Sequence, residues 1–265
     1  MEPKGLNTPL FRSYEVVRFY TLPPSSSIIY PYLLVNPRTY KMLFKVKFEH
    51  AILDCGVGIF KHDPSLTEYP PGFLSYWKRL AKYLTSIFKD RIWITIPDYP
   101  DDYNPGQFGD NVSKTLKNVE EFIKVKEVNW LPVIQSRYLD KHSFLQSCKL
   151  TRELIGDYPR VAIGTVCKTN NLEFIEYCCR TARKFFPRSH VHAFGLTLRA
   201  LPRVCAYLSS WDSLSYTFPR TRGHSCKSAS ERVRYFYEYL ERVEEVLKRL
   251  GCTPRARGMA SNMPY

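Results

Sequence analysis

The chain has 265 residues, of which 44% are hydrophobic and 15% aromatic, and this composition suits one globular domain with a full core. No apolar run approaches membrane-spanning length, and the first residues lack the apolar stretch of a secretory signal, so we expect an intracellular, cytoplasmic protein without a membrane partner. Its net charge of +14, from 39 Lys and Arg against 25 Asp and Glu, favours a polyanionic partner such as nucleic acid.

Residues 1–48 show no clean periodicity, except for an apolar run at 28–35 that is typical of a strand. We treat them as an N-terminal segment that packs on the main domain. After them, short apolar runs alternate with amphipathic helices. Strands are predicted at 51–53, 92–96, 130–134, 160–163 and 191–194, and helices at 73–88, 112–125, 141–155, 172–186 and 201–208.

Fully apolar strands that alternate with helices are typical of a parallel sheet buried on both faces. Five or six such units in one domain favour an α/β fold of the TIM-like (β/α)8 barrel type over an open doubly wound sheet. We assign residues 49–252 to this barrel. Its last element is a C-terminal helix, which begins after Ser228 because Ser228 and Glu231 have capping-box spacing, and which stops at Gly251. Residues 253–265 are predicted to be a flexible tail.

Polar or small residues stand where the predicted strands end. Asp54, Asp98, Gln135, Gly164 and Gly195 each occupy such a position. In a β/α barrel these ends converge on one face, where active sites are built. Each residue alone is explained by a helix cap or a turn, but together they indicate a site. A carboxylate and an amide suit the edge of a guanine-type base, and a further carboxylate can attack an anomeric carbon.

Six short motifs resemble, in the same order, those of the tRNA-guanine transglycosylase superfamily, whose members replace guanine in nucleic acid by a 7-deazaguanine. The motifs are Asp54-Cys55-Gly56-Val57, Ile96-Pro97-Asp98, Val133-Ile134-Gln135-Ser136, Ala162-Ile163-Gly164-Thr165, Val191-His192-Ala193-Phe194-Gly195 and Trp211-Asp212-Ser213-Leu214-Ser215-Tyr216. The resemblance implies that Asp212 is the nucleophile and that Asp54 moves protons. It also implies a base pocket formed by Asp98, Gln135, Gly164, Thr165, His192 and Gly195.

The chain departs from this family in several ways. The Cys-x-Cys-x-x-Cys…His zinc site and the appended RNA-binding domain are missing, and Val57 and Thr165 replace the second glycine of two pocket motifs. His224 and Cys226 have no further ligands at a recognisable spacing, so no cofactor is predicted and zinc is not supported. A compact relative of this sort resembles the DpdA-type enzymes of phages and mobile elements, which insert 7-deazaguanines into DNA.

The resemblance implies an enzyme that exchanges guanine in DNA for a 7-deazaguanine, most readily the 7-cyano form. The alternatives are the same exchange on tRNA and a non-catalytic barrel that only binds nucleic acid. DNA-modification partner proteins and the oligomeric state are left open. Arg220 and Arg222, just beyond Asp212, are predicted to contact the nucleic-acid backbone. A second basic group belongs either to a phosphate contact or to a charged outer helix face; it consists of Arg180, Arg183, Lys184 and Arg188. The paired acids Asp101 and Asp102 are expected to be solvated.

Overall fold

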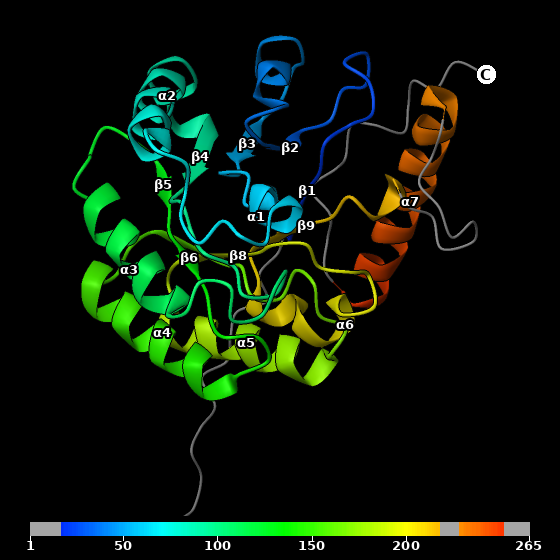
Figure 1. The fold of residues 1–265 in the computed structure, drawn as a ribbon. Helices are drawn as coiled ribbons and strands as arrows, with labels where there is room; N and C mark the ends of the chain where they lie inside the picture. Colours follow the sequence, from blue (N-terminus) through cyan, green and yellow to red (C-terminus); the bar gives the residue numbers. More distant parts are fainter. Residues whose placement is uncertain (1–16, 218–227, 252–265) are drawn as a thin grey trace, which may run out of the picture.

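The computed structural model describes residues 17–217 and 228–251, in which parallel strands alternate with helices (Figure 1). The strands form two sheets, one in the order β1-β9-β8-β7-β6 and the other in the order β2-β3-β4-β5. Their bounds are β1 Arg18–Tyr20, β2 Tyr32–Val35, β3 His50–Leu53, β4 Ile92–Thr95, β5 Trp130–Leu131, β6 Val133–Ile134, β7 Arg160–Ile163, β8 His190–Ala193 and β9 Ser210–Asp212. The α/β class with parallel sheets is therefore confirmed.

The two sheets adjoin at two places. β5 and β6 follow one another along the chain and are separated only by Pro132, which has no N–H to donate to a sheet ladder. At the other edge, a parallel bridge joins Thr21, directly after β1, to Leu33 in β2. The Thr21 amide donates to Tyr32 at 3.1 Å, and the Leu34 amide donates to Thr21 at 3.0 Å.

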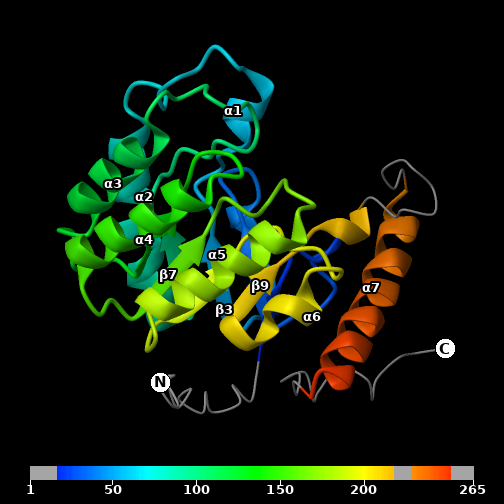
Figure 2. The same ribbon diagram turned by 90° about the horizontal axis from the view of Figure 1, so that it is seen from below.

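Helices and short 3₁₀ turns connect the strands and cover the sheets on the outside (Figures 1 and 2). The α-helices are α1 Gly58–His62, α2 Phe73–Phe88, α3 Asn111–Phe122, α4 Lys141–Ile155, α5 Leu172–Phe185, α6 Leu201–Val204 and α7 Ala229–Arg249, and the 3₁₀ helices are η1 Tyr40–Phe44, η2 Lys89–Arg91, η3 Cys205–Tyr207 and η4 Ser215–Thr217. Side-chain caps start α3, α4 and α5, where Asp110, Asp140 and Asn171 accept a backbone N–H.

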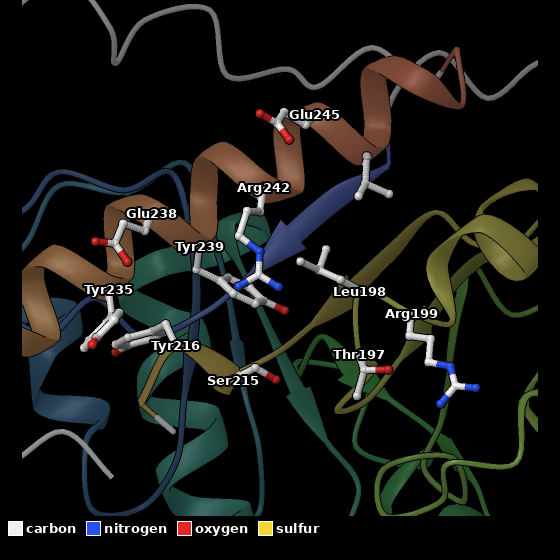
Figure 3. Close-up of a pocket in the computed structure, with 11 residues that line it drawn as sticks. Thr197, Leu198, Arg199, Ser215, Tyr216, Tyr235, Glu238, Tyr239, Arg242 and Glu245 are labelled. Atoms are coloured by element: carbon white, nitrogen blue, oxygen red, sulfur yellow. The ribbon is translucent and has the colours of Figure 1, made fainter. Parts of the chain in front are cut away.

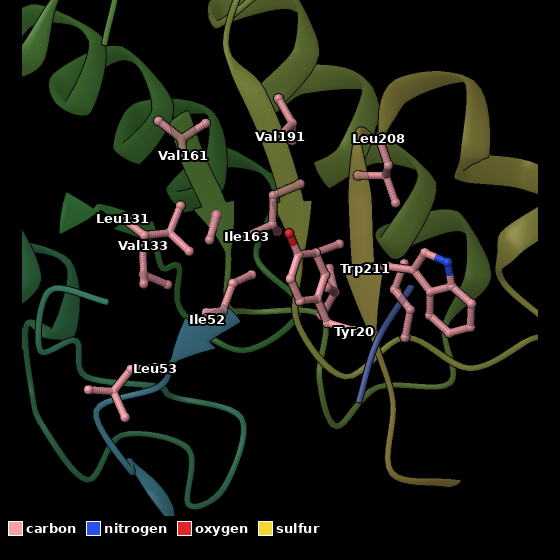
Figure 4. Close-up of a cluster of buried hydrophobic side chains, with 14 of the residues drawn as sticks. Tyr20, Ile52, Leu53, Leu131, Val133, Val161, Ile163, Val191, Leu208 and Trp211 are labelled. Atoms are coloured by element: carbon pink, nitrogen blue, oxygen red, sulfur yellow. The ribbon is translucent and has the colours of Figure 1, made fainter. Parts of the chain in front are cut away.

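The apolar strand residues form the core that lies between the sheets and the helices. Figure 4 shows Ile52, Val133, Ile163 and Val191 gathered from four different strands, and each is at most 2% exposed. Their burial follows from the apolar runs, since a parallel strand covered on both faces has no polar side. At its C-terminal side the core is continued by α7, whose Phe236 and Tyr239 rings contact the aromatic residues of the β1–β2 region.

The predicted helices at 73–88 and 141–155 and the strand at 160–163 are confirmed to the residue, and the capping box of Ser228 and Glu231 is present. The N-terminal segment 1–48 does more than pack on the main domain, because it supplies β1 and β2 to the two sheets. The boundary predicted after residue 48 therefore separates no structural unit. Arg220, Arg222, His224, Cys226 and the tail 253–265 lie outside the described residues.

Candidate active site

The predicted site residues lie at the C-terminal ends of neighbouring parallel strands. Asp54 directly follows β3, Asp98 follows β4, Gln135 directly follows β6, Gly164 directly follows β7, Gly195 follows β8, and Asp212 is the last residue of β9. Because all these strands run in the same direction, their C-terminal ends face the same side of the molecule. The structure thus brings these residues to one face, as the pattern predicts.

One carboxylate oxygen of Asp212 is held by two neighbours from the β8 segment. Its Oδ1 accepts a hydrogen bond from the Gly195 amide at 3.0 Å and lies 3.2 Å from Nε2 of His192. Gly195 has a φ of +65°, and a Cβ at this position would lie 2.4 Å from Sγ of Cys167, so a glycine is required here. Within the described part of the chain, Oδ2 has no hydrogen-bond partner. Asp212 therefore presents one fixed oxygen and one free oxygen.

A chain of side chains inside the core supports this arrangement. Nδ1 of His192 lies 2.8 Å from Oγ of Ser210, which lies 2.7 Å from Nε2 of His190. Burial, and next the neighbouring His192, hold the pKa of His190 well below its usual range, so this imidazole is neutral. If Nε2–H of His192 donates to Asp212, the Ser210 hydroxyl donates to His192 and accepts from His190. His192 is 0% exposed and lies behind Asp212.

Asp98 and Gln135 form a buried pair. Nε2 of Gln135 donates to Oδ2 of Asp98 at 2.5 Å, and Sγ of Cys55 donates to Oδ1 of Asp98 at 3.4 Å. Oε1 of Gln135 is buried and has no partner in the described residues. A Cβ at Gly164 would lie 2.1 Å from Nε2 of Gln135, so the glycine provides the space in which this amide lies. The pair thus leaves one acceptor oxygen, Oε1 of Gln135, available to an N–H donor near the C-terminal ends of the strands.

Two of the acids at the strand ends, Asp54 and Asp98, have raised pKa values. Burial, the Asp98 carboxylate and, more weakly, Asp212 raise the pKa of Asp54 to about 7, although the Gly56 amide opposes this shift. Burial also raises the pKa of Asp98 to about 6, while the hydrogen bonds from Gln135 and Cys55 oppose the rise. Near neutral pH, Asp54 is therefore divided between its acid and its base form, whereas Asp98 is mostly ionised. Such a difference between neighbouring acids is typical of acid–base sites.

Asp54 also lines a cavity of about 300 Å³ at the ends of β2 and β3. Arg38, His62, Phe73 and Tyr103 contribute to its walls, and this volume lies at the lower end of the range for small-molecule pockets. Asp98, Gln135, Gly164 and Asp212 do not line it. Of the other predicted pocket residues, Thr165 is 2% exposed and its hydroxyl lies 2.8 Å from that of Ser136. Thr165 is therefore part of the wall behind the site.

The expectation that Asp101 and Asp102 are solvated is wrong. Asp101 and Asp102 are 6% and 8% exposed rather than solvated. Asp101 accepts the Gly106 amide at 2.7 Å and the Tyr138 amide at 2.8 Å, and Asp102 accepts the Lys168 amide at 3.1 Å. These bonds connect the loop after β4 to the loops after β6 and β7. The sequence signal was ambiguous, because paired acids in a loop rich in Pro, Asn and Gly usually face water.

Arg183 is neither a phosphate contact nor part of an exposed charged face. It is 1% exposed, and its guanidinium donates to the carbonyl oxygens of Tyr207 at 3.0 Å and Ser189 at 2.8 Å and to the Ser209 hydroxyl at 3.0 Å. It thereby joins the end of α5 to the segment that leads into β9. Cys55 and Ser210 also contact site residues without having been assigned a role. Cys55 lies within one of the six motifs, whereas nothing in the sequence marks Ser210.

In residues 17–217 and 228–251, no three His, Cys, Asp or Glu side chains are arranged to hold a metal ion. No helix in these ranges is both long and apolar enough to cross a lipid bilayer. The cysteines of the described ranges are free thiols, and burial raises the pKa of Cys167 to about 12.

The chain matches no protein-family model and no characterised protein. Solved structures with partial similarity include a monomeric dihydrodipicolinate synthase variant, with 15% sequence identity and a TM-score of 0.38 over 75% of this chain and 68% of that one. Another is the carboxyl transferase domain of Rhizobium etli pyruvate carboxylase, with 12% identity and a TM-score of 0.35 over 77% of this chain and 43% of that one. Scores this low support no inference about the activity of this chain.

Proposed function

We propose that this protein is a base-exchange transglycosylase that replaces guanine in DNA by a 7-deazaguanine through a covalent Asp212 intermediate. The observation that carries the proposal is the group of three carboxyl groups, Asp54, Asp98 and Asp212, at the ends of parallel strands, of which Asp98 and Asp212 raise the pKa of Asp54. Only one of them, Asp212, has a carboxylate oxygen fixed by an amide and an imidazole while the other oxygen is free. The order of the motifs and the +14 charge support the same reading.

We infer that the two sheets belong to one closed ring, in which β5 and β6 act as a single interrupted strand. The Thr21–Leu33 bridge and the uninterrupted path through Pro132 support this inference. The ring then contains eight parallel positions, in the order expected for a TIM-like barrel. In such a ring, Asp212 and Asp54 lie on opposite sides of one opening, and a base between them would be within reach of both.

The reaction would begin with attack by Oδ2 of Asp212 on C1′ of a target deoxyguanosine. The C1′–N9 bond breaks, its electron pair stays on guanine, and the protonated form of Asp54 supplies the proton that guanine needs to leave. The pKa of about 7 at Asp54 suits this task, because both of its forms are populated at neutral pH. A base within a duplex is out of reach, so the target nucleotide must be flipped out or unpaired.

Base recognition would fall to Asp98 and Gln135. The ionised Asp98 carboxylate can accept the N–H groups of the guanine edge, and the unpartnered Oε1 of Gln135 can accept another. Binding therefore requires an N–H group of the base to compete with Nε2 of Gln135 for the Asp98 carboxylate. The incoming 7-deazaguanine occupies the same slot, gives its ring proton to Asp54 and attacks C1′, which releases Asp212 and restores the original anomeric configuration.

The buried position of His192 favours a role in orienting Asp212 over direct contact with the base. Its Nε2 and the Gly195 amide stabilise Oδ1, so that the charge used in the attack is directed through Oδ2. Holding the nucleophile in line supplies part of the rate enhancement without any change in its chemistry.

The test combines adduct trapping with nucleoside mass spectrometry. The wild-type protein, incubated with guanine-containing oligonucleotides and 7-cyano-7-deazaguanine, is expected to form a denaturation-resistant adduct and to place the new base in DNA. Asp212→Asn should abolish both, whereas Asp90→Asn, which removes an exposed carboxylate, should abolish neither. Parallel reactions with tRNA decide between the two substrates. Normal exchange by Asp212→Asn would refute the mechanism.

A further inference from the structure

A second and larger cavity, of about 680 Å³, is lined by residues that include Ser215 and Tyr216, which follow Asp212 closely in the chain (Figure 3). Its walls come from three segments: the loop after β8, which carries Thr197 to Arg199, the η4 turn just after Asp212, and the side of α7 that carries Tyr239 and Arg242. We call this cavity the α7 groove. The Asp54 cavity lies across the strand ends from it, at β2 and β3.

The lining of the α7 groove combines aromatic rings with two arginines. Arg199 and Arg242 have no acidic partner within 4.0 Å in the described ranges, and the Arg242 guanidinium lies 6.0 Å from the centre of the Tyr239 ring. The two acids at the groove, Glu238 and Glu245, already face partners on their own helix: Arg234 is 3.6 Å from Glu238, and Arg249 is 3.7 Å from Glu245. Figure 3 shows the Arg242 side chain directed into the groove and the Glu245 carboxylate directed away from Leu198 and Arg199.

A third feature is the hydroxyl group of Tyr239. This residue is 6% exposed and lines the groove, and its buried OH has no well-aligned hydrogen-bond partner in the described residues, although the Ser213 and Ser215 side chains lie near it. A poorly paired buried hydroxyl costs free energy, so a ligand oxygen that accepts its proton in good geometry would be favoured. The Asp212 carboxylate is among the groups that affect the pKa of Tyr239, which places this hydroxyl near the reacting end of β9.

We propose that the α7 groove binds the sugar-phosphate backbone of the nucleic-acid strand next to the exchanged nucleotide, with phosphodiester oxygens facing Arg242, Arg199 and the Tyr239 hydroxyl. This inference rests on the proposed function. Guanidinium groups suit phosphate because they are planar, permanently charged and rich in donors, and the neighbouring aromatic surface suits the sugar. The strand would leave the opening along α7 while the exchanged base turns toward Asp54.

The test measures binding of fluorescent single-stranded DNA that contains one guanine. Arg199→Ala and Arg242→Ala should each weaken binding about three- to tenfold, whatever the flanking sequence, and each should lower the salt dependence by about one released counterion. The matched control is Arg79→Ala, an exposed arginine on α2, which should bind as the wild type does. Tyr239→Phe removes only the hydroxyl and should weaken binding less than either arginine change.

Oligonucleotides with a single uncharged methylphosphonate linkage locate the contact without altering the protein. For the wild type, the linkage should weaken binding when it stands at one or two positions beside the guanine. At one of these positions the same linkage should not weaken binding by Arg242→Ala any further, because the variant has already lost that contact. If both arginine variants bind as tightly as the wild type while adduct formation at Asp212 persists, the groove assignment is refuted and the proposed function stands. If the wild type binds neither the DNA nor an RNA of the same sequence, both are refuted.

Discussion

Replacing Asp54 by Asn should stabilise the protein at neutral and alkaline pH while it slows base exchange. The carboxyl group of Asp54 has a pKa of about 7 in the folded protein, compared with 3.8 for an ordinary Asp, because burial and the nearby Asp98 disfavour its charged form. Between these two values the folded state binds more protons than the unfolded state. The free energy of unfolding must therefore fall as the pH rises from about 4 to 7.

The size of this effect follows from the shift. The rise of the Asp54 pKa from 3.8 to about 7 corresponds to a free energy of roughly 4 kcal/mol, because a difference of one in pKa equals about 1.4 kcal/mol. Asp54 is only half-buried and contacts a cavity, so water screens part of the penalty, and we expect a gain of about 2 kcal/mol at pH 8. At pH 4 the wild-type carboxyl group is protonated in the folded protein, so the two proteins should differ little there.

The assay is urea unfolding of the wild type and Asp54→Asn at several pH values from 4 to 8. The quantity of interest is the difference in the free energy of unfolding at each pH, since contributions from other titrating groups cancel in it. Asp90→Asn removes an exposed carboxylate on the same chain and should show a difference that hardly depends on pH. A difference for Asp54→Asn that stays constant across this range, or that falls toward high pH, would refute the assigned pKa and with it the proton-transfer role.

Three further changes test the site and its support. Gly164→Ala would place a Cβ 2.1 Å from Nε2 of Gln135 and should cost about 1–3 kcal/mol in thermal or urea unfolding, whereas Gly58→Ala, which meets nothing within 4 Å, should cost almost nothing. Asp98→Asn should raise the KM for the incoming base while the trapped Asp212 adduct can still form; an unchanged KM would contradict its role in recognition. Arg183→Met should destabilise the fold by about 3 kcal/mol because it leaves several buried oxygens unpaired, and the exposed Arg180 on the same helix gives the control Arg180→Met; equal stability of the two variants would contradict this account.

The amino-acid sequence by itself determined the helices and the apolar strands of the central part of this protein. The helices at 73–88 and 141–155 could be predicted to the residue, because their periodic apolar faces and caps such as Asp140 are local features. The positions of Asp54 and Gln135 followed for the same reason, since each stands directly after an apolar run. The sequence therefore determined that carboxyl and amide groups stand at these strand ends.

Only the tertiary structure decided what those residues contact. Strands β1 and β9 have three residues each and are paired with one another across about 190 positions of the chain, so no local pattern reveals them. The burial of His192 behind Asp212, the hydrogen bonds of Asp101 and the α7 groove likewise depend on segments that are distant in sequence. A short polar segment does not determine its own surroundings. The surroundings that shift a pKa or hold a carboxylate oxygen form only when segments distant in sequence come together in the fold.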